Sequence, residues 1–340
     1  MNPKVSVVMS VYNVSPFIRE AIQSIIDQTF TDFEFLIFND GSTDNSLEII
    51  NFFKDPRIQV FSYDKNRGIA TNANEGISRA RGKYIARMDG DDISLPQRFE
   101  KEFNFLETHP DFGMIGGWIA NMDASGSLGG EQWKFVAPPE EIPVTLLFNN
   151  YFANSTTMIR KSALPPIPYK KELITAEDYD LWTKIANTHR VWNLQEVLVH
   201  YRIHDKNISL QKTEKTKQGV QNIFKEQLLR LGVSYTKEQL DLHYHLSFET
   251  VHVDLKLLKM VESWYVKIYE ANNTTNKYDK VLLLKTLLGR WYILCRKLNE
   301  NQWVIFTQIF NSQLLRKNSL GLRDFARLAK IVCIRLFRYD

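Results

Sequence analysis

Residues 83–92 read KYIARMDGDD, an apolar stretch that ends in three carboxylates within four residues. The apolar part is typical of a buried strand, and Asp89, Asp91 and Asp92 follow where that strand would end. Carboxylates this close repel one another, which is costly unless a cation neutralises them. Oxygen ligands of this kind suit Mg²⁺ or Mn²⁺, which then bridge substrate phosphates. The alternative is a solvated acidic turn, which the apolar strand leading into the cluster disfavours.

The residues before this stretch alternate between strand and helix patterns. Strands are predicted at residues 5–11, 33–38, 58–63 and 83–88, and helices at residues 16–28, 43–53 and 69–80. This order predicts an α/β fold, Rossmann-like, with a mostly parallel sheet and helices on both faces. Ligands of such sheets bind beyond the carboxyl ends of the strands. We therefore expect functional residues directly after the strands.

The pattern changes after residue 95. We expect a helix at residues 96–108, a strand at 113–121, loops at 125–143, a strand at 155–160, a helix at 178–188 and a strand at 197–201. A Lys-rich polar stretch at residues 211–218 reads as a boundary, and helical periodicity dominates beyond it. The sequence thus predicts one domain over residues 1–210 and a helical C-terminal region over residues 211–340.

Composition and charge exclude several classes of protein. The chain has 340 residues, 44% of them hydrophobic, and only two cysteines, so neither a disulfide framework nor a zinc cluster is expected. No signal peptide or apolar run of about 20 residues is found, which predicts a cytoplasmic protein without a membrane span. Residues 1–210 carry a net charge of −6 and residues 211–340 one of +10. A basic part favours nucleic acid or phospholipid as a partner.

Three further clusters of polar residues follow predicted strands or open a helix. Residues 39–44 (NDGSTD) offer Asp40 to a nucleobase or ribose, or else form an ordinary strand-to-helix turn. Residues 176–182 (AEDYDLW) offer a general base, although acids in a first helical turn also suit the helix dipole. Residues 200–205 (HYRIHD) offer a metal-binding His and, in Arg202, a cation for a phosphate, against the alternative of surface or packed residues.

Six motifs occur in the order and spacing of one known family. They are VSVVMSVY (5–12), DGSTD (40–44), NRG (66–68), DGDD (89–92), EDYDLW (177–182) and YRIH (201–204). Over roughly residues 4–210, the chain resembles the family 2 inverting glycosyltransferases of bacterial surface-polysaccharide type. The resemblance implies a GT-A fold, a nucleotide diphosphate sugar as donor, with UDP favoured, and Mn²⁺ or Mg²⁺ as cofactor.

The resemblance assigns roles in donor binding to residues after the first strands. It implies that Asp40 binds the nucleobase, with the backbone of Val11 and Tyr12 beside it. Asn66 and Arg67 lie in a segment that commonly approaches the nucleotide.

The resemblance also implies a metal site. Asp89 and Asp91 match the motif that binds metal and ribose, with Asp91 as the main metal ligand. Asp92 would contact the donor sugar or the metal, and sequence alone does not separate it from Asp91. His204 would complete the metal–diphosphate site.

The resemblance implies an inverting displacement. Asp178 matches the catalytic base, and Glu177 would position the acceptor or the base. The acceptor would be a glycan linked to a polyprenyl diphosphate, as in O-antigen or capsule synthesis. Residues 287–291 (LLGRW) lack the glutamine of the motif found in processive synthases, which favours the transfer of one sugar.

The C-terminal segment from Ser319 to Tyr339 has an amphipathic, basic helical pattern. Such a helix can lie on an anionic membrane surface, which would place the protein peripherally on the inner face of the plasma membrane. Packing on the domain with a solvated basic face is the alternative.

Three other functions compete with the enzyme. A nucleic-acid-binding module would need a compact basic stripe or a known motif, which we do not find, so no nucleic acid partner is expected. A nucleotidyltransferase would need a Gly-rich phosphate loop, and residues 9–15 contain no glycine. A catalytically inactive scaffold that binds nucleotide sugars is disfavoured because every expected acid is present.

Overall fold

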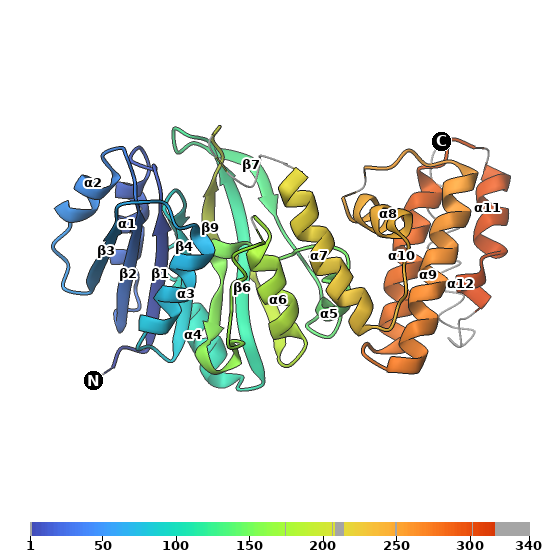
Figure 1. Ribbon diagram of the computed structural model, residues 1–340, viewed down its shortest axis with the longest axis horizontal. Helices are drawn as coiled ribbons and strands as arrows, with labels where there is room; N and C mark the ends of the chain where they lie inside the picture. Colours follow the sequence, from blue (N-terminus) through green and yellow to red (C-terminus); the bar gives the residue numbers. More distant parts are fainter. Residues whose placement is uncertain are drawn as a thin grey trace. The chain divides into compact units, whose positions relative to one another are not determined.

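The computed structural model describes residues 2–173, 175–205, 207, 214–248, 250–300 and 302–316. The chain divides into two compact units, one of residues 1–146 and 150–220, the other of residues 147–149 and 221–340 (Figure 1). The amphipathic pattern of residues 319–339 lies outside the described residues.

The first half of the sheet is parallel. Its strands, in the order β3-β2-β1-β4, are β1 (Val5–Val11), β2 (Phe33–Asp40), β3 (Ile58–Tyr63) and β4 (Tyr84–Asp89). The apolar runs of β1 and β2 are buried almost throughout, as is typical of parallel strands covered on both faces. The prediction of a Rossmann-like α/β fold with a mostly parallel sheet is confirmed.

Helices cover both faces of this half. On one face, alternate residues of β1 pack against the apolar sides of α1 (Ile18–Ile26), α2 (Ser46–Phe52) and α4 (Arg98–Thr108). On the other face lies α3 (Ile69–Arg79), whose Gly76 sits so close to the sheet that an added Cβ would be 2.4 Å from Cγ1 of Val8. The glycine lets this helix approach the strands closely.

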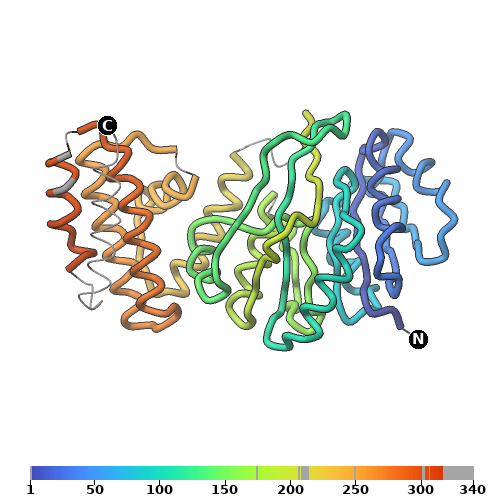
Figure 2. The backbone as a smooth tube through the Cα atoms, turned by 180° about the vertical axis from the view of Figure 1, so that it is seen from behind, coloured from blue at the N-terminus to red at the C-terminus, as the bar shows by residue number. Residues whose placement is uncertain are grey.

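The second half of the sheet is mixed. The strands are β5 (Ile93–Ser94), β6 (Phe112–Met122), β7 (Leu128–Trp133), β8 (Met158–Arg160) and β9 (Arg190–Arg202). Strand β8 pairs antiparallel with both β4 and β6, whereas β6 and β9 run parallel. In Figure 2, which shows the backbone from behind, β6 and β9 lie side by side. The short strand β5, which follows β4 in the chain, pairs antiparallel with residues 199 and 200 near the end of β9.

Three predicted boundaries in this half were wrong. Residues 125–143 were expected to be loops but contain β7 and the short helix α5 (Ile142–Thr145). The strand expected at residues 197–201 begins at Arg190, and the one expected at 155–160 starts as the 3₁₀ turn η1 (Asn154–Thr156). All six residues of strand β7 (LGGEQW) are exposed, so pairing with β6, not an apolar pattern, makes it a strand.

The second unit is helical. The helix α7 (Glu214–Arg230) includes residue 220, where the chain divides between the two units. The second unit contains α8 (Lys237–Ser247), α9 (Leu255–Thr275), α10 (Lys280–Arg296), α11 (Gln302–Phe310) and α12 (Gln313–Arg316). None of the helices in the described part of the chain has the length and apolarity that a membrane span requires.

The core of this unit includes Phe148, which is fully buried and stacks on the ring of His243. His243 Nδ1 accepts a hydrogen bond from the Trp264 indole N–H at 3.1 Å, so its Nε2 carries the proton and donates to the Leu147 carbonyl at 2.9 Å. Burial lowers the pKa of His243 to about 4, which keeps the ring neutral. Residues 147–149 are therefore held by polar as well as apolar contacts.

Candidate active site

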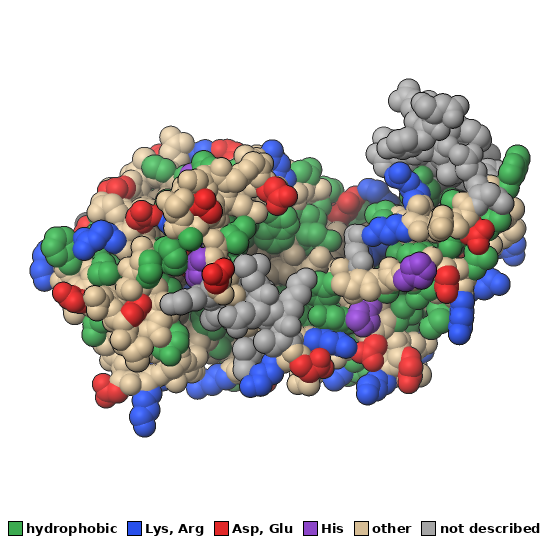
Figure 3. Space-filling model, turned by 90° about the horizontal axis from the view of Figure 1, so that it is seen from above, with side chains coloured by type: hydrophobic (Ala, Val, Ile, Leu, Met, Phe, Trp, Pro, Cys, Tyr) green, Lys and Arg blue, Asp and Glu red, His purple; other side chains and the backbone are tan. Residues whose placement is uncertain are grey.

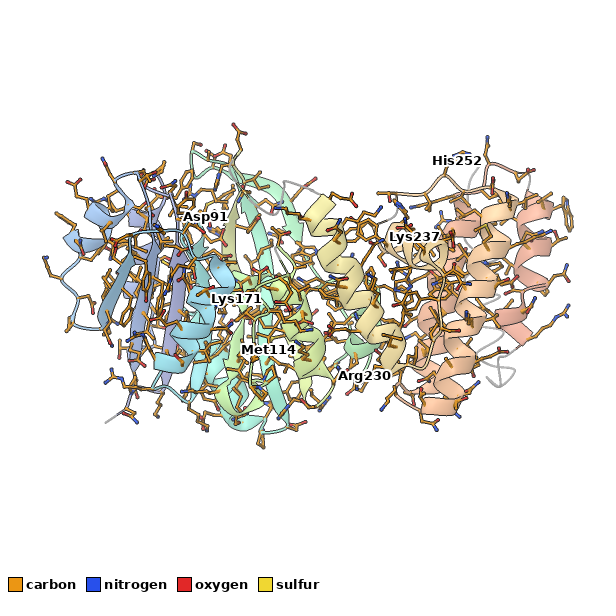
Figure 4. The ribbon with its side chains drawn as sticks, in the orientation of Figure 1. Asp91, Met114, Lys171, Arg230, Lys237 and His252 are labelled. Carbon is orange, nitrogen blue, oxygen red and sulfur yellow. The ribbon has the colours of Figure 1, made fainter. Side chains whose placement is uncertain are left out.

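The strand order locates the site before any side chain is considered. Strand β1 has β2 on one side and β4 on the other, so the order of strands reverses between β1 and β4. Ligands of open α/β sheets bind at this switch point, outside the carboxyl ends of the strands. Figure 4 labels Asp91 at this end of the sheet, and Figure 3 looks onto it and shows acidic side chains with a histidine on the surface.

Asp91 and His204 lie side by side although they are far apart in sequence. Asp91 follows β4, and His204 follows β9. The distance between His204 Nε2 and Asp91 Oδ2 is 3.0 Å, and the imidazole also packs on the ring of Phe17, with centroids 4.6 Å apart. One carboxylate and one imidazole can hold a divalent cation. Within the described residues, no group of three or more His, Cys, Asp or Glu side chains could hold a metal alone.

Asp92 has a different environment from Asp91. It is 1% exposed, its Oδ2 accepts a hydrogen bond from Ser155 Oγ at 2.5 Å, and its Oδ1 accepts one from the Arg202 backbone N–H at 3.0 Å. Burial, with Asp91 and Asp89 nearby, raises its pKa well above the usual value. Asp92 therefore holds the acidic turn against η1 and β9, which favours Asp91 as the metal ligand.

Asp89 is held by the same 3₁₀ turn. Its Oδ1 accepts a hydrogen bond from Asn154 Nδ2 at 2.8 Å, and its backbone N–H donates to Ser155 Oγ at 3.2 Å. Burial and the charge of Asp91 raise the pKa of Asp89. Sequence reasoning missed Asn154 and Ser155. The polar run NNYFANSTT at residues 149–157, just before a buried strand, was the available signal.

The side chain of Arg202, at the end of β9, is turned toward the acidic turn. Its side chain is 2% exposed, Nε donates to the Asp91 carbonyl at 2.9 Å, and Nη2 donates to Glu20 Oε2 at 2.6 Å. Its Nη1 faces the carbonyls of Asp123 and Ala124 at 3.5 and 3.3 Å. The guanidinium positions the acidic turn, which argues against the phosphate contact expected for it.

Asp40 joins two loops at the end of β2. It is 3% exposed, and its two carboxylate oxygens accept the backbone N–H groups of Arg67 at 2.8 Å and of Gly68 at 3.0 Å. Gly68 has a φ of 86°, which favours glycine, and its N–H also approaches Asn66 Oδ1 at 3.1 Å. Each carboxylate oxygen keeps further acceptor capacity for a nucleotide.

The side chain of Arg67 is occupied within its own segment. Its guanidinium lies 3.2 Å from the centre of the Tyr63 ring and donates to Glu75 Oε2 at 2.8 Å. The backbone after β1, by contrast, is open: Tyr12 is 46% exposed, whereas Val11 is buried. This exposed aromatic ring directly follows the carboxyl end of β1.

Asp178 and Glu177 open the helix α6 (Glu177–Ala186). Asp178 accepts hydrogen bonds from the Tyr179 backbone N–H at 2.6 Å and from Asn150 Nδ2 at 3.3 Å. Burial, together with the nearby Asp89 carboxylate, raises the pKa of Asp178 to about 6. A carboxylate with this pKa is ionised at neutral pH and is basic enough to take a proton.

Glu177 is more deeply buried. It is 8% exposed, and among the described residues its Oε2 has no hydrogen-bond partner. Burial and the charge of Asp178 raise its pKa to about 8, so the group is mostly protonated at neutral pH. The pair therefore combines one ionised and one neutral carboxyl group at a single helix terminus.

Comparisons with known proteins agree with this architecture. The model of the family Glycosyl transferase family 2 matches residues 6–165. An uncharacterized glycosyltransferase of Haemophilus influenzae is 30% identical over 300 residues, covering 83% of this chain and 90% of that protein. The O-antigen biosynthesis glycosyltransferase WbnJ of Escherichia coli is 32% identical over 212 residues, covering 59% of this chain and 80% of that protein.

Solved structures share the fold. The S. aureus TarS 1-349 crystal structure in complex with UDP-GlcNAc has a TM-score of 0.59 at 18% identity, covering 86% of this chain and 88% of that one. The mannosyltransferase PcManGT from Pyrobaculum calidifontis, in complex with GDP-Man and Mn2+, has a TM-score of 0.53 at 14% identity, covering 85% and 87%. With the family match and the relatives of known class, these findings show that the chain is a glycosyltransferase of family 2 with a GT-A fold.

Proposed function

We propose that this protein is a metal-dependent inverting glycosyltransferase. It would move one hexosyl group from a nucleotide diphosphate sugar, with UDP favoured, to a hydroxyl of a lipid-linked oligosaccharide in surface polysaccharide synthesis. The observations that support the proposal are the contact of Asp91 with His204 at 3.0 Å and the closeness of Asp178 to Asp89, the first residue of the same acidic motif. The O-antigen relative and the neighbour solved with UDP-GlcNAc support the choice of pathway and donor.

The residues have distinct roles in a single displacement. Asp178 accepts the proton of the acceptor hydroxyl as that oxygen attacks the anomeric carbon, and the bond from this carbon to the diphosphate breaks. Mn²⁺ or Mg²⁺, held by Asp91 and His204, would neutralise the charge that develops on the leaving diphosphate. Asp92 and Arg202 hold the acidic turn in place, and Asn150 holds the base. Attack opposite the leaving group inverts the anomeric configuration.

The test of this proposal is nucleotide release from a panel of UDP-, GDP-, dTDP- and CMP-sugars. It is measured with Mn²⁺, with Mg²⁺ and with EDTA, in the presence of a lipid-diphosphate-linked acceptor. We expect Asp178→Asn to lose roughly 10²–10⁴-fold in transfer because the amide cannot take the proton, while donor binding survives. Asp27→Asn, an exposed site at the end of α1, is the matched control and should keep full activity.

Three outcomes contradict the proposal. Equal turnover by the wild type and Asp178→Asn would show that Asp178 is not the catalytic base. Turnover that is undiminished in EDTA would show that the reaction does not depend on a metal. Release of nucleotide without transfer to any glycan would leave hydrolysis, and not glycosyl transfer, as the activity.

A further inference from the structure

The segment that precedes η1 is fixed to the helix that carries the candidate base. Asn150 Nδ2 donates to Asp178 Oδ2 at 3.3 Å, and Asn150 Oδ1 accepts the backbone N–H of Phe152 at 3.0 Å. The Phe152 ring is buried and makes a T-shaped contact with the ring of Trp182 in α6, with centroids 6.5 Å apart. Residues on both sides of Tyr151 therefore contact α6, which places Tyr151 next to the base.

The ring of Tyr151 stacks on the ring of Phe135. The two centroids are 4.0 Å apart, and the planes differ by 20°. The Tyr151 carbonyl accepts a hydrogen bond from Asn193 Nδ2 in β9 at 2.8 Å, and the Phe135 carbonyl accepts one from Trp118 Nε1 in β6 at 3.1 Å. Both backbones are thus bonded to the sheet, so the position of the stack is defined by the fold.

The region around this stack exposes aromatic and apolar side chains. Tyr151, Phe135 and Trp118 are partly exposed. On the segment that contains Phe135, Trp133 is 38% exposed and Val136 is 71% exposed. Single exposed apolar residues are normal, but a group of them marks an interaction or ligand-binding surface. The candidate base is also partly exposed, so a substrate can approach it from solvent.

The contacts along this segment separate the acceptor side of the site from the donor side. Asn150 bonds to the base, whereas Asn154 and Ser155, a few residues further on, bond to carboxylates of the acidic motif. In a displacement, the diphosphate leaves on the side of the acidic motif, and the acceptor hydroxyl attacks on the side of the base. Tyr151 directly follows Asn150, so it lies at the acceptor end of the segment.

An aromatic stack suits a sugar because a pyranose ring has two kinds of surface. Hydroxyl groups project from its rim, whereas C–H groups lie on its faces and carry a partial positive charge that the negative face of an aromatic ring attracts. Ligand sites combine such contacts with a few polar groups, here the base and its amide partner. We propose that the stack of Tyr151 on Phe135 binds the acceptor glycan through the face of a pyranose ring and directs the attacking hydroxyl to Asp178. This inference rests on the proposed function.

The test is Tyr151→Leu, with Phe135→Leu as a second variant, because leucine keeps an apolar side chain but has no flat ring. Initial rates of transfer give the KM for the lipid-diphosphate-linked acceptor, and calorimetry gives the Kd of the nucleotide sugar. We expect either variant to raise the acceptor KM about 3–10-fold, the contribution of one aromatic stack, and to leave the donor Kd unchanged. Hydrolysis of the donor without acceptor should stay at its wild-type rate.

Two controls separate stacking on the acceptor from packing within the protein. Tyr151→Phe keeps the ring and should keep the wild-type acceptor KM. Phe52→Leu removes a different ring, which is 68% exposed on α2, and should also leave the acceptor KM unchanged. Melting temperatures of all variants show whether a change in stability accompanies the change in acceptor KM.

The outcomes distinguish this inference from the function on which it rests. If the wild type transfers no sugar to any acceptor in the panel, both fail. If the wild type is active and the two leucine variants keep its acceptor KM, or raise the donor Kd by the same factor, only the acceptor stack fails. The stack also fails as a binding surface if Tyr151→Phe loses as much as Tyr151→Leu, or if neither leucine variant folds.

Discussion

At the scale of the residue, the reactivity of Asp178 is set by what surrounds it. Burial and the Asp89 carboxylate raise its pKa, whereas the hydrogen bonds from the Tyr179 backbone and from Asn150 lower it. Glu177, which is mostly protonated at pH 7, precedes Asp178 at the start of α6, and its pKa is raised by the Asp178 charge. The balance leaves a base that is ionised above about pH 6.

Removal of the Asn150 amide should raise the pKa of Asp178, because the hydrogen bond from this amide lowers it. The amide favours the ionised carboxylate, so Asn150→Ala should raise the pKa of Asp178 above its value of about 6. The acid limb of the pH profile of kcat/KM should then shift to higher pH, and activity should fall more at pH 6 than at pH 8. Asn104→Ala, an exposed site on α4, is the control. An acid limb that stays in place would show that Asn150 does not tune the base.

At the scale of the element, the close packing of α3 on the sheet positions segments next to the site. This helix carries Asn74, which fixes Tyr169, and follows the loop that Asp40 holds. Its approach depends on Gly76, where a Cβ would lie 2.4 Å from Val8 Cγ1 and 3.1 Å from the Phe38 ring. An added methyl group would push the helix away from β1 and β2.

We therefore expect Gly76→Ala to destabilise the protein by roughly 1–3 kcal/mol, the usual cost of overpacking. Gly289→Ala is the matched control, because Gly289 lies within α10 and a Cβ there meets nothing within 4 Å. Alanine should be neutral or stabilising by up to about 1 kcal/mol at that position, since glycine is a poor helix former. Urea denaturation measures both, and equal stability of the two variants would contradict the close approach of α3.

At the scale of the whole molecule, the free energy of unfolding should depend on pH in two ways. Acids with lowered pKa values in the folded state stabilise it above about pH 4, and this contribution is lost as the pH falls. The partly buried acids among them include Glu34, Asp44, Asp55 and Glu75. Glu177 acts in the opposite sense, because its folded pKa of about 8 is above its ordinary value.

Between about pH 4.5 and 8 the unfolded chain releases the Glu177 proton and the folded protein keeps it. The folded state binds more protons there, so stability falls as the pH rises. Glu177→Gln removes this effect and should be more stable than the wild type at pH 8, with the difference disappearing near pH 4.5. Urea denaturation at pH 5, 6.5 and 8 measures the trend. A variant less stable than the wild type at pH 8 would show that Glu177 is a paired, stabilising group.

Sequence by itself determined the class of fold and the family, because both depend on local patterns. Strand β1 was predicted at the residues it occupies, since a β-branched run with no breakers is a local signal. The acidic motifs were also visible as local runs of sequence. Their position directly after predicted parallel strands indicated that they lie at one edge of the sheet.

Only the tertiary structure distinguished residues that look alike in sequence. Asp91 and Asp92 are adjacent carboxylates, yet one meets His204 and the other is buried against Ser155 and Arg202. Asn154 and Ser155 were not predicted as site residues, because their contacts with Asp89 and Asp92 join residues 63 to 66 positions apart in the chain. Hydrogen-bond partners, burial and therefore pKa values arise from contacts across the fold, and no periodicity of the sequence encodes them.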